Sequence, residues 1–379
     1  MVKLAYAHDG TSVYDTLFLS YLTQSNTVSF LTFNRNPQRV SGKEIVVKMP
    51  FSTDLLPRIE GLYMYVFCFF RAFLLRFSLK RIKPDVLLGC VATKYGFYSA
   101  LSGFKPFILI VWGSDILIAP KRFFLFRFMV KFTLKKANAV IVDSEVQRNA
   151  AIQLGCDPRK ILKFPWFDLE SIRVKTSRSE TRQKLGWRKN PIIICLRRHD
   201  WIWGVQYFIE AIPHVISVIP ESRFLLLGKG QLSDTFKQRV KELKIQKCVK
   251  FLGQVSREDA ITYLNAADVY VSTSLSDGTS ASLLEAMTLG VAPIVTNISG
   301  NVEWIKNGWN GYLVPTKDSQ RLAETIVMLV KNKELRQKIS QNAFKTVNTS
   351  IDWRKNSKAL QDLIFKLATK QTLEAGKRK

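Results

Sequence analysis

Two acidic residues flank a run of small hydroxylated residues, SDGTSASLLE, in the second half of the chain. Asp277 stands near the start of this run and Glu285 at its end, with seven residues between them. Ionised carboxylates accept strong hydrogen bonds from hydroxyl groups, so the pair could bind a polyhydroxylated ligand. The run reads as a loop followed by a helix, and the amides at the helix start, in residues 278–282, would suit a phosphate group.

The same run has a purely structural interpretation. Ser282 and Glu285 have the spacing of a capping box, in which each side chain bonds the amide of the other residue at the start of a helix. The SDG sequence is also a common turn. Spacing alone therefore leaves two possibilities open, a binding site or a turn followed by a helix cap.

Basic residues follow two other predicted strands. Arg197 and Arg198 come directly after the apolar run at 192–196, and Lys229 lies between two glycines after the run at 223–227. These cations could hold an anionic ligand, although a single Gly-x-Gly is weak support and arginines at a strand end can simply be solvated.

The elements that would position these residues follow from hydrophobic patterning. Short apolar runs alternate with helical patterns along the chain, which predicts parallel sheets covered by helices. The predicted strands are residues 2–7, 27–33, 44–49, 85–90, 107–113, 139–144, 192–196, 223–228, 250–253, 268–274, 293–297 and 311–314.

A polar stretch at 173–190 interrupts this alternation and is interpreted as an interdomain connection. We therefore predict an α/β protein with two doubly wound, Rossmann-like domains, 1–172 and 173–352, which face each other across a ligand-binding cleft. Residues 353–379 form a last amphipathic helix with no strand after it, so this helix must pack on a domain already built.

The chain has 57 Lys and Arg against 30 Asp and Glu, a net charge of +27. Such an excess indicates an anionic partner: nucleic acid, an anionic membrane surface or a phosphorylated substrate. Nucleic acid is not expected because the chain carries no recognisable nucleic-acid motif. Five widely spaced cysteines, with no Cys-x-x-Cys pair, predict reduced buried thiols and no metal site.

Two segments, near 58–83 and at 121–136, combine phenylalanine with Arg and Lys. Arginines interrupt their apolar runs well short of the ~20 residues that a membrane span needs. They predict helices that lie on an anionic membrane surface, or else core helices with solvated basic faces. Since the N-terminus has no signal-peptide pattern, we expect a cytoplasmic protein bound to the inner face of the membrane.

Residues 251–315 closely resemble the C-terminal domain of retaining glycosyltransferases of family 4, which have the GT-B fold. That family has two acidic residues separated by seven others, normally both Glu, followed by a Gly-x-x-Glu-like segment. Here the first acid is Asp277, the second is Glu285, and the later segment SGNVE ends in Glu303.

The resemblance implies roles for these residues. Glu285 would hold the nucleotide ribose, and Asp277 the donor sugar with a reach shortened by one methylene. Arg197 or Arg198 would hold the diphosphate, and Lys229 would replace a family lysine whose position is taken by Trp203. Further donor-binding positions implied are Gly10, Thr279, Ser280, Ala281, Ser282 and Glu303.

In the first domain the resemblance places Asp115 toward the acceptor, with a helix N-cap as the alternative. His8, beside Gly10, could be either an ordinary strand-end residue or a catalytic one.

The reaction implied is transfer of a sugar from a nucleotide-diphosphate sugar to an acceptor hydroxyl with retention, without metal or cofactor. No carboxylate nucleophile is evident, which favours same-face substitution with a donor phosphate oxygen assisting deprotonation. The acceptor expected is a lipid-linked or membrane-associated glycan in cell-surface polysaccharide or glycoconjugate synthesis. A nucleotide-sugar epimerase of the same fold and a basic nucleic-acid-binding protein are the alternatives.

Overall fold

The computed structural model describes residues 1–10, 13–34, 45–48, 63–165 and 167–376. The chain divides into two compact units, one made of Met1–Trp166 with Arg354–Lys379 and the other of Phe167–Trp353. The predicted boundary at 172/173 falls six residues late, because Phe167, Leu169 and Ile172 pack in the core of the second unit. Each unit is described by itself.

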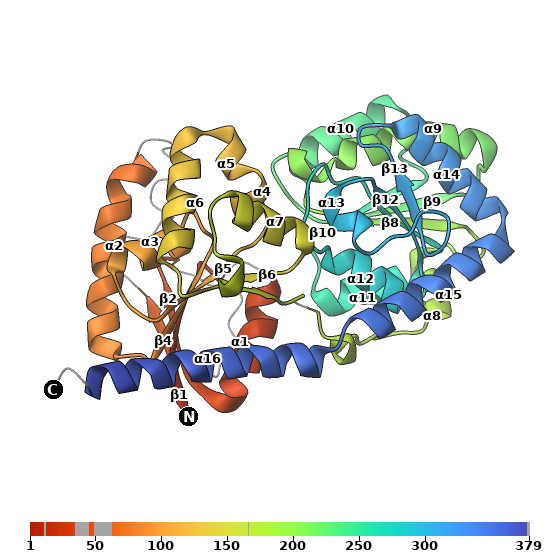
Figure 1. Ribbon diagram of the computed structural model, residues 1–379. Coiled ribbons are helices and arrows are strands. Elements are labelled where there is room, and N and C mark those ends of the chain that lie inside the picture. The colour runs from red at the N-terminus through yellow and green to blue at the C-terminus, as the bar shows by residue number, and fades with distance from the viewer. Residues whose placement is uncertain (11–12, 35–44, 49–62, 166, 377–379) are drawn as a thin grey trace. The chain divides into compact units, whose positions relative to one another are not determined.

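Among its described residues, the first unit has a seven-stranded parallel sheet in the order β3-β2-β1-β4-β5-β6-β7 (Figure 1). The strands are β1 (Val2–Ala7), β2 (Asn26–Thr32), β3 (Ile45–Lys48), β4 (Val86–Cys90), β5 (Phe107–Ile110), β6 (Ala139–Val142) and β7 (Ile161–Lys163). The helices are α1 (Val13–Ser25), α2 (Tyr63–Ile82), α3 (Tyr95–Ser102), α4 (Ser114–Leu117), α5 (Ala119–Arg122), α6 (Phe124–Lys136), α7 (Glu145–Gln153) and α16 (Trp353–Gly376).

Alternate residues of these strands are buried on opposite faces of the sheet. Ala5 and Ala7 of β1 belong to the core beneath α2, α3 and α6. Leu4 and Tyr6, which are also buried, point to the other face, on the side of α1. A strand covered on both sides reads as a continuous apolar run, which is why the sequence pattern located these strands.

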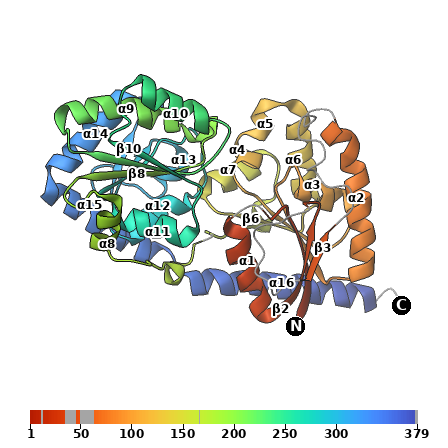
Figure 2. The ribbon, with the colours of Figure 1, turned by 180° about the vertical axis from the view of Figure 1, so that it is seen from behind.

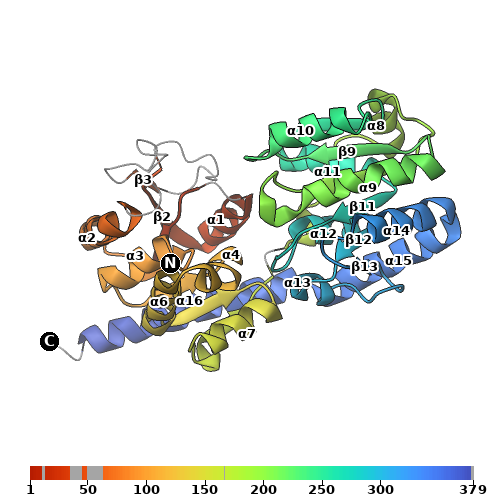
Figure 3. The same cartoon turned by 90° about the horizontal axis from the view of Figure 1, so that it is seen from above.

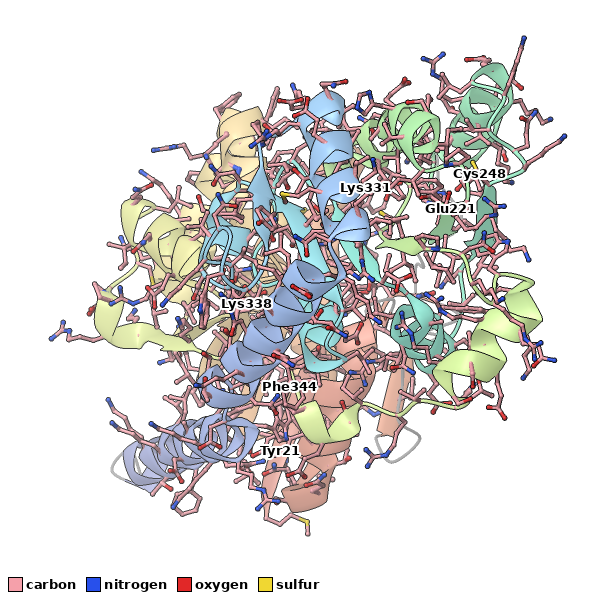
Figure 4. The ribbon with its side chains drawn as sticks, turned by 90° about the vertical axis from the view of Figure 1, so that its right-hand side faces the viewer. Tyr21, Glu221, Cys248, Lys331, Lys338 and Phe344 are labelled. Atoms are coloured by element: carbon pink, nitrogen blue, oxygen red, sulfur yellow. The ribbon has the colours of Figure 1, made fainter. Side chains whose placement is uncertain are left out.

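Helix α16 packs against the N-terminal part of the first unit, along the foot of its sheet (Figure 2). Its Leu360 and Ile364 are fully buried. The hydroxyl of Tyr21 on α1, labelled in Figure 4, donates to the carbonyl of Ser357, and Asn26 donates to Gln361 at 3.1 Å. These contacts hold the last segment of the chain to the end of α1 and the start of β2.

The second unit has a six-stranded parallel sheet in the order β10-β9-β8-β11-β12-β13, which lies between two layers of helices (Figure 3). The strands are β8 (Ile192–Leu196), β9 (Arg223–Leu227), β10 (Val249–Gly253), β11 (Val269–Ser272), β12 (Ala292–Thr296) and β13 (Tyr312–Val314). The helices are α8 (Arg178–Leu185), α9 (Val205–Val218), α10 (Ser233–Glu242), α11 (Arg257–Ala266), α12 (Ala281–Thr288), α13 (Ser299–Val302), α14 (Ser319–Lys331) and α15 (Lys333–Ser350).

The polar stretch at 173–190 is not a linker, and that prediction is wrong. It contains α8, which begins with a capping box between Ser177 and Glu180 and buries Leu185 in the core of the second unit. A polar helix with a single row of buried residues gives a weak apolar pattern, so composition alone suggested a connection.

The prediction of two doubly wound α/β units is confirmed. In each sheet the chain adds two strands on one side of its first strand and then continues on the other side, so β1/β4 and β8/β11 are the points where the strand order reverses. Ligands of such sheets bind beyond the carboxyl ends of the strands at these switch points. The two switch points are therefore where functional side chains are sought.

All five cysteines are buried and form no disulfide, as predicted. Within the described residues, none of the helices combines the length and the apolar character that crossing a membrane requires. The predicted membrane-facing segment begins at residue 58, and its first residues, 58–62, lie outside the described part of the chain.

Candidate active site

Arg197 is the central cation of the switch point in the second unit. It follows β8, and its Nε donates to the hydroxyl of Ser272 at the end of β11 at 2.9 Å. Its Nη2 lies 2.9 Å from Oδ2 of Asp277 and also donates to Ser280. The guanidinium lies 5.1 Å from the ring centroid of Trp203, the residue at the family's lysine position. Four contacts, with Ser272, Asp277, Ser280 and Trp203, therefore fix the position of the Arg197 side chain.

Asp277 is paired with this arginine and only 14% of its side chain is exposed. Burial raises the pKa of its carboxyl above the ordinary value, while the charge of Arg197 opposes that rise. An arginine keeps its charge at every accessible pH. The ion pair therefore places a permanently charged guanidinium beside the loop that precedes α12.

The start of α12 lies beside this pair. Ser280 is the N-cap, and its hydroxyl accepts from the amide of Leu283. The alternative interpretation, a capping box of Ser282 and Glu285, does not hold: Ser282 lies inside the helix, where its hydroxyl contacts Tyr270 at 2.7 Å. Ala281 is the first helical residue, so the orphan amides at the helix start lie beside the guanidinium of Arg197.

Glu285 does not cap the helix either. It is 6% exposed, and its Oε1 accepts from Nε of Arg257 at 3.0 Å. Burial raises the pKa of Glu285, and Arg257 counteracts the shift. Arg257 also donates to the hydroxyl of Ser171 at 3.1 Å. Arg257 was not predicted as a site residue, because a basic residue in the first turn of a helix such as α11 has no local signal for a partner 28 residues away.

The glycine loop after β9 packs on the main chain that follows β8. A Cβ on Gly228 would lie 2.1 Å from the carbonyl oxygen of Arg197, and one on Gly230 would lie 2.5 Å from that of His199. Only glycine allows this approach. Lys229, between them, is exposed, and 73% of the Arg198 side chain is exposed beside Asp200. Of the two predicted arginines, Arg197 is the one inside the site.

The segment with Glu303 packs on the same loop. A Cβ on Gly300 would lie 2.2 Å from the carbonyl oxygen of Gly278, so α13 and the loop touch through their main chains. Thr279 accepts a hydrogen bond from the indole of Trp304 at 3.3 Å. Glu303 ends α13 and is half-buried. The predicted donor residues of the second unit therefore converge at one edge of its sheet, although their roles stay predictions.

In the first unit, Asp115 is buried, with 3% of its surface exposed. Its oxygens accept from the amides of Ala92 at 2.7 Å and Trp112 at 3.0 Å. Asp115 thereby links the segment that follows β4 to the segment that follows β5. It is not the N-cap of α4, because Gly113 holds that position and Asp115 lies inside the helix. Gly10 adopts a positive φ of 73°. The predicted roles of Asp115 toward an acceptor and of Gly10 toward the donor stay predictions.

His8 and Asp15 form a pair that the sequence did not predict. Among the described residues, His8, Asp9 and Asp15 are the group of His and acidic side chains whose ligand atoms all lie within 4.8 Å of one another. Nδ1 of His8 is hydrogen bonded to Asp15, and the Tyr6 hydroxyl donates to the same carboxylate. These bonds join Tyr6, His8 and Asp15 into one buried hydrogen-bonded network.

Known proteins similar to this chain are glycosyltransferases. It is 31% identical over 189 residues to the UDP-Gal:alpha-D-GlcNAc-diphosphoundecaprenol alpha-1,3-galactosyltransferase of Escherichia coli, and the match spans 48% of this chain and 48% of that protein, about half its length. It is 24% identical to an uncharacterized glycosyltransferase of Methanocaldococcus jannaschii, over 92% of this chain and 93% of that protein.

Solved structures share the fold at low identity. Anabaena HepE, solved with UDP-glucose, gives a TM-score of 0.79 at 19% identity and covers 97% of this chain and 100% of its own. Sucrose-phosphate synthase from Thermosynechococcus elongatus gives 0.76 at 16% identity, covering 99% and 100%. Two tandem Rossmann-like units of this kind constitute the GT-B fold.

Two family models match the sequence, one in each unit. The model described as glycosyl transferase 4-like matches residues 3–144, and the model described as glycosyl transferases group 1 matches residues 177–346. Because a glycosyltransferase model matches most of each unit, the chain belongs to the family 4-like glycosyltransferases.

Proposed function

We propose that the chain transfers a sugar from a nucleoside-diphosphate sugar to a hydroxyl group of an acceptor, with retention of configuration. The observation that carries this proposal is the placement of Arg197 beside the start of α12, with Glu285 one turn further along the helix. The guanidinium and the helix amides suit a diphosphate, and the buried carboxylate of Glu285 suits the hydroxyls of a ribose.

In this proposal Arg197 stabilises the negative charge that develops on the departing diphosphate. A buried, preorganised cation is effective here because it does not have to reorganise as the bond breaks. Asp277 contacts the donor sugar through its carboxylate. Its pairing with Arg197 at 2.9 Å makes it a weak nucleophile, which favours same-face substitution over a covalent intermediate.

The acceptor we propose is a lipid-linked saccharide at a membrane surface. The names of two relatives support this class. The Escherichia coli protein is named for a GlcNAc-diphosphoundecaprenol acceptor, and a Campylobacter jejuni relative, 27% identical over 227 residues, for a diacetylbacillosaminyl-diphospho-undecaprenol acceptor. We place the chain in the synthesis of cell-surface polysaccharide or glycoconjugate.

The first unit has a surface suited to such a membrane. Helices α2 and α6 both contact α3 and contain no acidic residue (Figure 1). The phenylalanines that they expose are Phe69, Phe70, Phe73 and Phe77 on α2, and Phe124 and Phe128 on α6. Arg127, Lys131 and Lys135 are exposed at four-residue intervals on α6. Aromatic rings beside cations suit the boundary between acyl chains and anionic headgroups.

A thermal-shift and transfer experiment tests the enzyme activity. UDP-galactose, UDP-glucose, UDP-GlcNAc and GDP-mannose are compared as donors, and GlcNAc-diphosphate on a short polyprenol serves as acceptor. One donor should raise the melting temperature, as ligands of the native state do, and its sugar should appear on the acceptor with the donor's anomeric configuration. No shift and no transfer with any donor would contradict the proposal, and epimerised sugar in a reaction without acceptor would favour the epimerase.

Vesicle sedimentation tests the membrane surface. Replacing Arg127, Lys131 and Lys135 by glutamine should reduce binding to vesicles containing phosphatidylglycerol, since each basic residue near an anionic surface contributes about 1 kcal/mol. The control replaces Lys241, Lys244 and Lys247, three exposed lysines of the second unit, and should bind as the wild type does. If both triple variants lost vesicle binding equally, the net charge of the protein, and not the surface of α6, would account for the binding.

A further inference from the structure

The switch point of the second unit contains a tryptophan beside its central cation. Trp203 is the last residue of η4 (Trp201–Trp203), a short 3₁₀ helix that follows β8, and its side chain is half-buried. The ring packs against the hydrophobic core that contains Val205 and Phe208 of α9. The guanidinium carbon of Arg197 lies over the same ring, 5.1 Å from its centroid. One aromatic ring therefore contacts both the core and the cation.

The main chain that carries Trp203 is bound to the segment that follows β11. The carbonyl of Ile202 accepts from the amide of Leu275 at 2.8 Å, and the hydroxyl of Thr273 donates to the carbonyl of Trp203 at 3.4 Å. A Cβ on Gly204 would lie 2.2 Å from the carbonyl oxygen of Thr273, an approach that only glycine permits. These contacts fix the ring relative to the chain that runs from β11 to α12.

The cation beside this ring has little access to water. Only 9% of the Arg197 side chain is exposed, against 73% for the neighbouring Arg198. A cation is attracted to the π face of a tryptophan, and the attraction is larger where water is excluded. The interaction of a charge with an anion is also stronger where the local dielectric is low. Trp203 therefore stabilises the charged guanidinium in a site that keeps its field strong, and it adds no charge of its own.

The ring complements the hydrogen bonds of Arg197. A guanidinium is planar and its N–H groups point outward in that plane, so hydrogen bonds act at its edges. Here they reach the hydroxyls of Ser272 and Ser280, and the carboxylate of Asp277 lies 2.9 Å from Nη2. An arginine side chain that is ordered only when a ligand arrives loses rotamer freedom on binding, which weakens the binding. A ring that already holds the guanidinium reduces this loss.

We propose that Trp203 is a positioning residue for the donor diphosphate: its ring holds the guanidinium of Arg197 beside the start of α12, in the orientation that stabilises the leaving diphosphate. This role rests on the proposed function. Because the main chain of η4 fixes the ring, the cation does not have to reorganise as charge develops on the diphosphate. Trp203 acts on the diphosphate only through Arg197, so removal of the ring should have no effect where Arg197 is absent.

Two substitutions of similar size separate the π face from simple packing. Trp203→Phe keeps an aromatic face, and Trp203→Met fills a similar volume without one. Transfer is assayed with the donor that gives the thermal shift, and UDP and GDP are titrated calorimetrically. Trp203→Met should lower kcat/KM about 10-fold and weaken binding of the nucleoside diphosphate by a similar factor, whereas Trp203→Phe should lose about threefold or less.

The matched control is Trp201→Met, at the other end of the same 3₁₀ helix. The Trp201 side chain is 54% exposed, and its main-chain carbonyl would still accept from the amide of Gly204, so kcat/KM and diphosphate binding should stay as in the wild type. Equal losses in Trp203→Phe and Trp203→Met would show that the π face has no part, and would overturn the proposal. A loss in Trp201→Met as large as that in Trp203→Met would overturn it too.

A double-mutant cycle with Arg197→Ala tests whether Trp203 acts through the cation. In the Arg197→Ala background, Trp203→Met should leave kcat/KM unchanged, because the group that the ring positions is absent. A general loss of structure would instead lower kcat/KM by the same factor in both backgrounds, and such additivity would overturn the role. If Trp203→Met melts below the assay temperature, Trp203→Phe takes its place in the cycle and its smaller loss should likewise vanish.

Failure of the proposed function has a different signature. A wild type that binds neither UDP nor GDP and transfers no sugar from any donor would overturn the proposed function, and this role with it. A wild type that transfers sugar, with additive losses in the cycle, would overturn only the role of Trp203.

Discussion

The two units build the same strand order, with one further strand in the first unit, but place different basic side chains at the switch point. In the second unit Arg197 pairs with Asp277 at 2.9 Å, and in the first unit His8 pairs with Asp15 at 2.8 Å. Each basic side chain follows the first strand of its sheet, and each acid is buried or nearly so. The scaffold is shared, and one side chain in each unit decides whether the local charge is permanent or depends on pH.

This difference separates two kinds of chemistry. A guanidinium cannot lose its proton in a protein, so Arg197 suits the binding of a diphosphate whose charge increases as it leaves. An imidazole gains and loses a proton near neutral pH, so His8 suits proton transfer. Function therefore depends on the side chains placed at the strand ends, and the common fold supplies only their positions.

The largest effect is expected from the permanent cation. Arg197→Ala should lower kcat/KM by about 10³-fold, since it removes charge stabilisation and leaves the buried Asp277 unpaired. Arg198→Ala is the adjacent comparison and should lose far less, because 73% of that side chain is exposed. Steady-state kinetics with melting curves measure both variants. Equal losses would show that the two arginines share the ligand.

A second ion pair of the same unit gives the next largest effect. Glu285→Gln should lower kcat/KM by about 10²-fold through loss of charged hydrogen bonds. Arg257→Gln should act through Glu285: without the arginine the pKa of Glu285 rises further, so donor binding, which needs the carboxylate, should weaken at a higher pH than in the wild type. The measurement is donor KM against pH. An unshifted acid limb in Arg257→Gln would mean that Arg257 does not control Glu285.

The pH dependence of stability should have opposite signs in the two units. The folded pKa of His8 is raised, so its contribution to stability is present at low pH and is lost as pH rises through that pKa. Burial lowers the pKa of His199, which is 2% exposed, so its contribution is present above 6.5 and is lost as pH falls. One such proton changes stability by at most about 1.4 kcal/mol per pH unit.

Calorimetric unfolding of His8→Gln and His199→Gln between pH 5 and 8 measures these slopes. Relative to the wild type, His8→Gln should lose most stability at low pH and His199→Gln most at high pH. If the stability difference from the wild type changed with pH in the same direction in both variants, the predicted opposite pH dependence of the two units would be wrong.

The sequence predicted those features that depend on local pattern. All six strands of the second unit were located, and four of them, β8, β9, β11 and β12, are almost entirely buried and form continuous apolar runs. Strand β7, a three-residue strand with no fully buried residue, was missed. Helix α8 was missed because its residues are mostly polar. Local patterns thus located the edge of the sheet where the candidate site lies.

The contacts within the site could not be predicted in this way. Glu285 had a plausible local partner in Ser282, but its actual partner, Arg257, is brought to it by the packing of α11 near α12. The His8–Asp15 pair spans only seven residues, yet its burial depends on Tyr6 and on the start of α1. Distant partners and burial decide these contacts, and neither leaves a local signal.

The smallest effect concerns the backbone at the two switch points. In the second unit, glycine occupies the positive-φ positions after β9 and before α9, Gly228 and Gly204, whereas the first unit has Val91 at a φ of 63°. Asparagine tolerates this conformation better than valine does. Val91→Asn should therefore raise the free energy of unfolding by up to about 1 kcal/mol, measured by denaturant titration. Val174→Asn, an exposed position without positive φ, should show no gain. A loss of stability in Val91→Asn would mean that packing of the valine side chain outweighs the strain of its backbone.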